Sequence, residues 1–106
     1  MTFKEWEKEN FGYDVITTYF EDFTIAEHFG TKAIKDTYAR AKEEYKNNYK
    51  VLTELSLILN HKLWFEYNKG NMKLAKVYDE LWRKHHSHCI NHLEGEELSY
   101  YLTVTD

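Results

Sequence analysis

A row of apolar side chains at spacings of three and four residues is the feature that most restricts how this chain can fold. The row consists of Ile34, Tyr38, Ala41, Tyr45, Tyr49, Leu52, Leu55, Leu59, Leu63 and Tyr67. Such spacing places all of its members on one face of an α-helix. It predicts one long helix over residues 31–67, with Thr31 as its N-terminal cap. A straight helix of that length would be longer than a domain of this size is wide, so we expect a bend near residues 46–48.

The chain has no proline, and its four glycines, at positions 12, 30, 70 and 95, separate the periodic segments instead of interrupting them. This pattern is typical of helices joined by short turns. Gly70 suits the left-handed position after the long helix, and Asn71 can cap a second helix over about residues 72–93. Because the turn is short, the two helices are expected to form an antiparallel αα-hairpin. The predicted fold class is therefore all-α, with a long, kinked helix, a second helix and short flanking helices.

The segments on either side of this pair are shorter and less regular. Residues 3–10 and residues 96–104 each fit a short helix that depends on docking for its stability. Residues 13–23 are rich in β-branched and aromatic side chains, which favours a strand, although coil or a short hairpin fits equally well. Residues 24–27 have the spacing of a capping box, which predicts the start of a short helix that ends at Gly30.

Size and charge restrict the class of partner. The 106 residues, 42% of them apolar, suit one packed helical domain over residues 1–106. With 14 basic and 18 acidic residues, the formal charge of -4 argues against a general nucleic-acid binder, because binding to the nucleic-acid backbone requires clustered Lys and Arg. Proteins are therefore the favoured partners.

The location of the protein can also be predicted from its sequence. No apolar run approaches the roughly 20 residues that span a bilayer, and the charged start of the chain lacks the apolar stretch of a secretory signal. Cys89 is the only cysteine, which fits a reducing compartment. We therefore predict a cytoplasmic protein that makes no contact with a membrane.

One stripe of residues has the chemistry of a metal site. His85, His88, Cys89 and His92 follow the spacing i, i+3, i+4 and i+7 and could approach zinc or copper. The same stripe carries core residues such as Tyr78, and its outer pair lie about 10 Å apart along the helix axis, too far to share one ion easily. We therefore expect buried, hydrogen-bonded imidazoles without a metal or other cofactor. A metal-binding or catalytic helical protein that uses this stripe is the alternative function.

Motifs for catalysis are missing from the sequence. It contains no Gly-x-Ser-x-Gly nucleophile turn, no Glu-x-x-His pair of the kind that holds two metals in a helical bundle, and no glycine-rich phosphate loop. We therefore predict that the protein is not an enzyme.

Residues 55–65 form a segment that is apolar around most of the helix circumference. Leu57 and Trp64 project to one side of the main apolar row, and Ile58 and Phe65 project to the other. Such a helix is either central in the fold or gives one face to a partner. The rest of the chain offers little to cover all four side chains, so we predict that they bind a partner, either a second copy in a homodimer or a host protein.

Seven short segments carry a resemblance to a known group of proteins. They are TYFEDF at 18–23, TIAEHFG at 24–30, AIKDTY at 33–38, YKVLTEL at 49–55, LNHKLW at 59–64, LW at 81–82 and GEELSYY at 95–101. Together they resemble short uncharacterised α-helical proteins of phages and mobile elements of Gram-positive bacteria. The resemblance covers residues 18–106 and leaves residues 1–17 as an N-terminal extension.

The resemblance implies a genetic context and no catalytic residue. Small accessory proteins in that context often bind and block a host protein. It therefore implies a non-enzymatic protein-binding module that acts in the host cytoplasm. An inhibitor of a host defence system, of the anti-CRISPR or anti-restriction type, is the specific form of this hypothesis.

Overall fold

The computed structural model describes residues 1–13, 19–44 and 46–105, and these residues form helices without any strand. The helices are α1 (Phe3–Phe11), α2 (Phe20–Phe29), α3 (Thr31–Glu44), α4 (Tyr49–Asn68), α5 (Met72–His92) and α6 (Gly95–Thr105). The predicted all-α class is confirmed.

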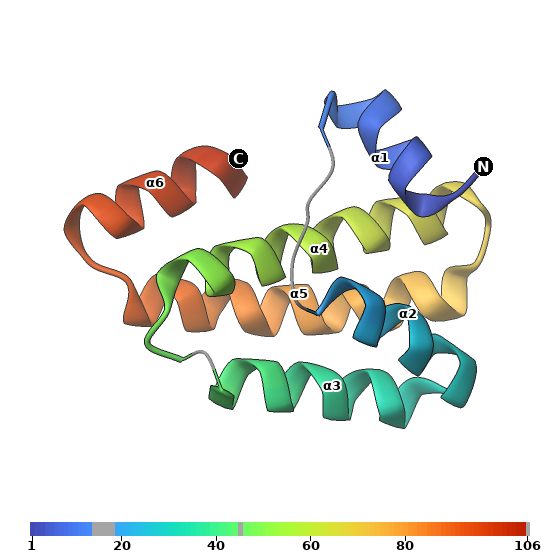
Figure 1. Ribbon diagram of the computed structural model, residues 1–106, viewed down its shortest axis with the longest axis horizontal. Helices are drawn as coiled ribbons and strands as arrows, with labels where there is room; N and C mark the ends of the chain where they lie inside the picture. The colour runs from blue at the N-terminus through green and yellow to red at the C-terminus, as the bar shows by residue number, and fades with distance from the viewer. Residues whose placement is uncertain (14–18, 45, 106) are drawn as a thin grey trace.

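The helix α4 lies at the centre of the arrangement. It makes its most extensive contact with α5, and both α1 and α6 also pack against it. Figure 1 shows α4 and α5 side by side across the middle of the molecule, with α3 on one side of them and α1 and α6 on the other. The helix α2 packs mainly on α3. Because α4 has neighbours on several sides, much of its circumference has to be apolar.

The single long helix predicted over residues 31–67 is two helices, so that prediction is wrong. The helix α3 ends at Glu44, and α4 begins at Tyr49. Asn48 is extended, and its side-chain oxygen accepts a hydrogen bond of 3.3 Å from the backbone N–H of Val51. Such a cap satisfies a free N–H at the start of a helix, and Asn is a poor residue for a helix interior. The expected bend near residues 46–48 is therefore a complete break. Tyr45, a member of the apolar row, lies outside the described residues.

The turn between α4 and α5 has the predicted residues in the predicted conformations. Gly70 has a φ of 82°, in the left-handed region that favours glycine. Asn71 caps α5, because its side-chain oxygen accepts a hydrogen bond of 3.3 Å from the backbone N–H of Leu74. The short helices expected at the two ends of the chain are present as α1 and α6.

The capping box predicted at residues 24–27 is wrong. The helix α2 starts earlier, at Phe20, so Thr24 lies within it. The Thr24 hydroxyl donates a hydrogen bond of 3.1 Å to the carbonyl of Phe20 instead of capping. Gly30 follows the last residue of α2, as predicted. A strand, coil or short hairpin is predicted over residues 13–23. Positions 14–18 of this segment lie outside the described residues, and the segment is helical from Phe20 onward.

Two clusters of buried apolar side chains form the core, and α4 contributes to both. The larger one contains Tyr19, Phe23, Ala26, Ile34, Tyr38, Ala41, Leu55, Ile58, Leu59, Val77, Tyr78 and Leu81. The smaller one contains Leu52, Cys89, Leu93 and Tyr101. Among the described residues, no helix has the length and apolar character that a membrane span requires.

Candidate functional site

The second half of α4 buries its charged side chains and exposes two aromatic ones, whereas helices usually expose charged and bury aromatic side chains. Lys62 and Glu66, the only Lys, Arg, Asp or Glu residues in positions 55–68, are each only 4% exposed. Trp64 and Tyr67, in contrast, are 45% and 51% exposed. A buried charge is costly unless it is paired and hydrogen-bonded. The buried charges and the exposed aromatic rings therefore each need an explanation.

Lys62 is paired inside the protein with Glu27 of α2. Its ammonium Nζ lies 2.7 Å from Glu27 Oε2 and 3.4 Å from the hydroxyl oxygen of Thr24. The Tyr78 hydroxyl of α5 donates a hydrogen bond of 2.6 Å to the same Glu27 oxygen. Desolvation, together with the Glu27 charge, raises the pKa of Tyr78 far above its ordinary value, so its hydroxyl remains a donor. This network joins α2, α4 and α5.

Aromatic rings surround the same ammonium group. The ring centroids of Phe3, Phe20 and Tyr78 lie 5.2, 5.3 and 5.6 Å from Lys62 Nζ, within the range of cation–π attraction. Phe3 belongs to α1, and its ring also contacts Phe20 and Phe65 at centroid separations of 5.4 and 5.3 Å. The helix α1 therefore covers the buried charge of α4.

A second buried polar pair attaches α1 to α4. Glu7 and His61 are both buried, and the Glu7 carboxylate forms a hydrogen-bonded pair with His61 Nδ1. The Phe11 ring stacks on the imidazole at 4.0 Å between centroids with an angle of 9° between the planes. The pair and the stacked ring together fix the position of α1.

Glu66 is the least satisfied charged group of α4. Its Oε2 atom is buried, accepts no hydrogen bond from the described residues and lies 4.0 Å from the Lys69 ammonium Nζ. Desolvation raises the pKa of the Glu66 carboxyl, and the Lys69 charge offsets part of that rise. The Glu66 carboxylate therefore has a hydrogen-bonding partner in the Asn71 side chain, but its ion pair is looser than that of Lys62.

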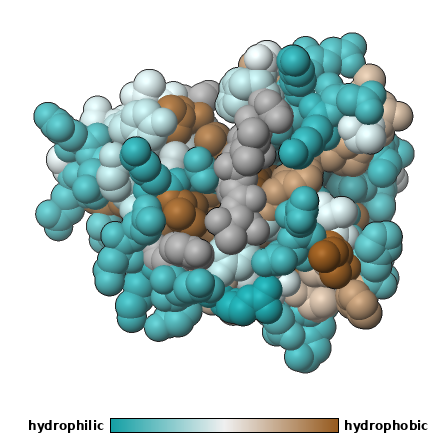
Figure 2. Space-filling view, in the orientation of Figure 1, coloured by the Kyte–Doolittle hydropathy of each residue, from teal (hydrophilic) through white to brown (hydrophobic). Residues whose placement is uncertain are grey.

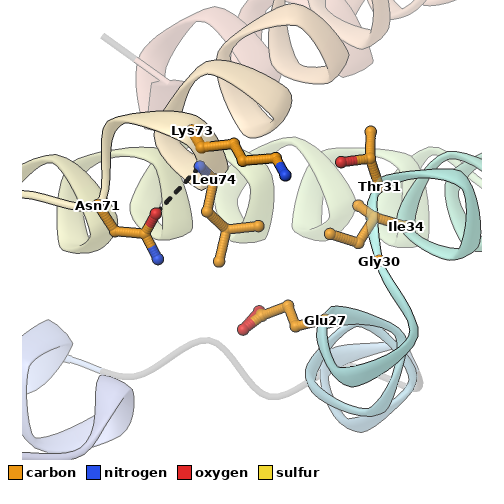
Figure 3. A pocket seen from close by; sticks show the side chains of 7 residues that line it. All are labelled: Glu27, Gly30, Thr31, Ile34, Asn71, Lys73 and Leu74. Carbon is orange, nitrogen blue, oxygen red and sulfur yellow. Dashed lines mark hydrogen bonds between the residues drawn. The ribbon is translucent and has the colours of Figure 1, made fainter.

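Glu27 lines two pockets. One of about 500 Å³ is lined by Met1, Thr2, Phe3, Lys4, Phe20, Thr24, Glu27, Lys62, Phe65, Glu66 and Lys69. The other, of about 210 Å³, is shown in Figure 3 and is lined by Glu27, Gly30, Thr31, Ile34, Asn71, Lys73 and Leu74. The described residues that line them include no His, Cys or Ser, and Glu27 and Lys62 are engaged with each other.

A third pocket lies over α4, where the last residues of α1 and α6 come close. It has a volume of about 210 Å³ and is lined by Phe11, Tyr13, Leu57, Asn60, His61, Trp82, Val104 and Thr105. Its three α4 residues and Trp64 follow the spacing i, i+3, i+4 and i+7, so they share one face of the helix. Trp82 Nε1 is buried and has no hydrogen-bond partner in the part of the chain that the structure describes. This pocket therefore adjoins the exposed aromatic side chains of α4.

The predicted histidine stripe divides into buried and exposed members. His85 is buried, and its Nε2–H donates a hydrogen bond of 2.7 Å to the Leu52 carbonyl. Its Nδ1 lies 3.4 Å from the Tyr38 hydroxyl. Burial lowers the pKa of His85 to about 4 and raises that of the neighbouring Cys89 thiol to about 12. Both side chains are therefore neutral at physiological pH, and the expected hydrogen bond from a core imidazole to the backbone is present.

The other two members of the stripe lie next to each other on successive turns. The rings of His88 and His92 are 4.0 Å apart between centroids, and His92 Nδ1 donates a hydrogen bond of 2.9 Å to the His88 carbonyl. His88 Nε2 is buried and has no hydrogen-bond partner among the described residues. Within residues 1–13, 19–44 and 46–105, no group of three or more His, Cys, Asp or Glu side chains is arranged to hold a metal ion. The structure does not bring the four stripe residues together around one point.

The four side chains predicted to bind a partner also separate into two kinds. Ile58 and Phe65 are buried within the chain, so they cannot contact a partner in this arrangement. Leu57 is partly buried against the larger core cluster, and Trp64 is exposed. Tyr67, which the sequence places in the apolar row, is exposed beside Trp64 instead.

The buried polar residues of the site were not predicted, although one signal for them is present. His61 and Lys62 occur in a segment with no polar face, and polar residues in such a helix must be buried with partners. Nothing in the sequence identifies those partners, because Glu27 and Glu7 lie 35 and 54 positions away from Lys62 and His61.

Comparison of the chain with protein-family models, curated proteins and solved structures found no match. The function is therefore inferred from the residues and contacts of this chain.

Proposed function

We propose that this chain is a non-enzymatic protein-binding module and that it binds through the outward side of the second half of α4. That side, here named the α4 face, consists of Leu57, Asn60, Trp64, Tyr67 and Asn68. The observation that carries the proposal is the exposure of Trp64 and Tyr67, whose rings contact each other edge-on at 5.7 Å. Tryptophan and tyrosine are among the side chains that contribute most of the binding energy of protein interfaces.

The α4 face has no charged side chain, which is unusual in a chain of which 30% is charged. The two charges of this part of α4, Lys62 and Glu66, point inward and are buried. A charged group of a partner would lose its water on this face without gaining an opposite charge. The matching partner surface is therefore itself uncharged and apolar.

The biological setting of the proposal comes from the resemblance to small proteins of phages and mobile elements. In that setting, binding would block a host protein in the host cytoplasm, and the inhibitor would act against a defence system of the anti-CRISPR or anti-restriction type. The formal charge of -4 favours a protein over a nucleic acid as the target.

The test compares two pairs of exposed side chains in a capture experiment from host lysate. Replacing Trp64 and Tyr67 with Ser should abolish capture of a specific protein that the native chain retains. Ile25 and Phe29 of α2 are 55% and 78% exposed and provide a matched control. Figure 2 shows hydrophobic atoms at the end of the molecule where α2 lies, within a largely hydrophilic surface. The Ile25→Ser/Phe29→Ser variant should retain the same protein, and capture by the Trp64→Ser/Tyr67→Ser variant would refute the proposal.

A further inference from the structure

The α4 face carries a projecting side chain and a recess next to each other. Trp64 projects into solvent, and the third pocket opens one helical turn earlier on the same side of α4. Leu57, Asn60 and His61 line the pocket from α4, and Trp64 follows them at the i+7 position. One surface therefore contains both a protrusion and a cavity.

The recess has the size and lining to accept an aromatic ring. Its volume is about 210 Å³, and an apolar cavity of roughly 150 Å³ can hold benzene. Phe11, Tyr13 and Trp82 contribute aromatic walls.

A surface that holds both halves of a contact suits a two-fold symmetric dimer. In such an interface the same patch is used on both copies, so each protrusion must find its cavity on an identical surface. We propose that the partner of the α4 face is a second copy of this chain, with Trp64 of each copy seated in the recess of the other. This inference rests on the proposed function, because it assigns the same face to a second copy of this chain in place of a host protein.

Charge is compatible with the pairing of two identical chains. Each chain carries a formal charge of -4, so an interface containing acidic groups would bring like charges together. The α4 face contains none, and the nearby Glu66 carboxylate is buried on the inner side of α4. Asn60 and Asn68 provide both donors and acceptors, so they can pair with an identical surface.

Sedimentation of the purified, untagged protein over a range of concentrations tests the proposal. The native chain should form dimers, and Trp64→Ser should weaken dimerisation by about 30-fold or more. Asn60→Phe, which fills the recess, should weaken it similarly, and Val104→Trp provides a second filling variant should Asn60→Phe fail to fold. Phe29→Ser removes a more exposed aromatic side chain outside the face and should leave dimerisation unchanged.

Mixing the two defective variants gives the sharpest result. A Trp64→Ser chain keeps an open recess, and an Asn60→Phe chain keeps its tryptophan, so an equimolar mixture should regain dimers through one intact contact. The proposal would be overturned by any of three results. These are a native chain that is monomeric at every concentration, a mixture that does not regain dimers, and a Phe29→Ser variant that weakens dimerisation as much as Trp64→Ser does. If the native chain is monomeric while capture of another protein depends on Trp64 and Tyr67, the second copy is excluded and the proposed function stands.

Discussion

The two long helices α4 and α5 distribute their polar residues in opposite ways. In α5, every Lys, Arg, Asp and Glu is at least partly exposed, and Asp79 and Arg83 form an ion pair of 3.1 Å at the surface. The polar groups that α5 buries, such as His85 and Cys89, are held neutral. The second half of α4 instead buries the charges of Lys62 and Glu66.

This difference shows which physical force holds each helix in place. The burial of α5 follows its amphipathic pattern, because its charged side chains remain in water. The position of α4 depends on partners supplied by α1, α2 and α5, since an unpaired charge in its environment would be costly. Removing a partner of a buried α4 charge should therefore lower the free energy of unfolding strongly. The contribution of α5 to stability should instead depend mainly on the protonation of its buried His85.

The largest expected effect is that of Glu27→Ala. It leaves the buried Lys62 ammonium without its carboxylate and should lower the free energy of unfolding by about 3–5 kcal/mol. Asp79→Ala, which breaks the surface pair of α5, should cost less than about 1 kcal/mol. Urea denaturation measures both. Adding Lys62→Met to Glu27→Ala should recover much of the loss, and an equal cost for the two single variants would contradict the comparison.

Acid should destabilise the protein through His85 of α5. Its pKa in the folded protein is lowered from 6.5 to about 4, so the unfolded chain binds a proton more readily. Stability should therefore be complete above pH 6.5 and fall as the pH decreases toward 4, by about 3 kcal/mol in total. His85→Gln should flatten this part of the pH profile, measured by urea denaturation at each pH. The His28→Gln variant, which replaces an exposed histidine of α2, should keep the native slope, and an unchanged slope in His85→Gln would exclude this origin.

Gly70→Val should destabilise the connection between α4 and α5 and thus test the predicted antiparallel αα-hairpin. A Cβ atom at this position meets no atom within 4 Å, so the cost comes from the backbone alone. A β-branched residue at a φ of 82° should cost about 1–3 kcal/mol, seen as a lower melting temperature. Gly70→Asn, which tolerates the left-handed region, should cost less. Equal melting temperatures for Gly70→Val and the native chain would show that the turn does not require a left-handed residue.

The smallest expected effect on stability is that of Trp64→Ser. Because this side chain is exposed, the free energy of unfolding of the monomer should change by no more than about 0.5 kcal/mol. The adjacent Phe65→Ser should cost several times more, about 3–5 kcal/mol, because Phe65 is buried. Chemical denaturation at a concentration that gives monomers measures both. A large cost for Trp64→Ser would mean that this ring supports the fold and is not free for an interface.

Local features of the sequence were sufficient to predict most of the helices. The apolar spacing of α5, the left-handed Gly70 and the cap at Asn71 involve residues within a few positions of each other, so their physics is present in the sequence itself. The hydrogen bond from His85 to the backbone could also be expected, because a core imidazole needs a partner.

Tertiary structure decided which polar groups lie inside and which aromatic groups lie outside. The apolar row continues across the break at residues 46–48, because α3 and α4 bury their apolar faces in the same large core cluster. Lys62 could be buried only because Glu27 and Tyr78 reach it from distant parts of the chain. Spacing along one helix shows which side chains share a face, but the contacts of that face are made by other helices, so only the folded chain determines that Phe65 is covered and Trp64 is not.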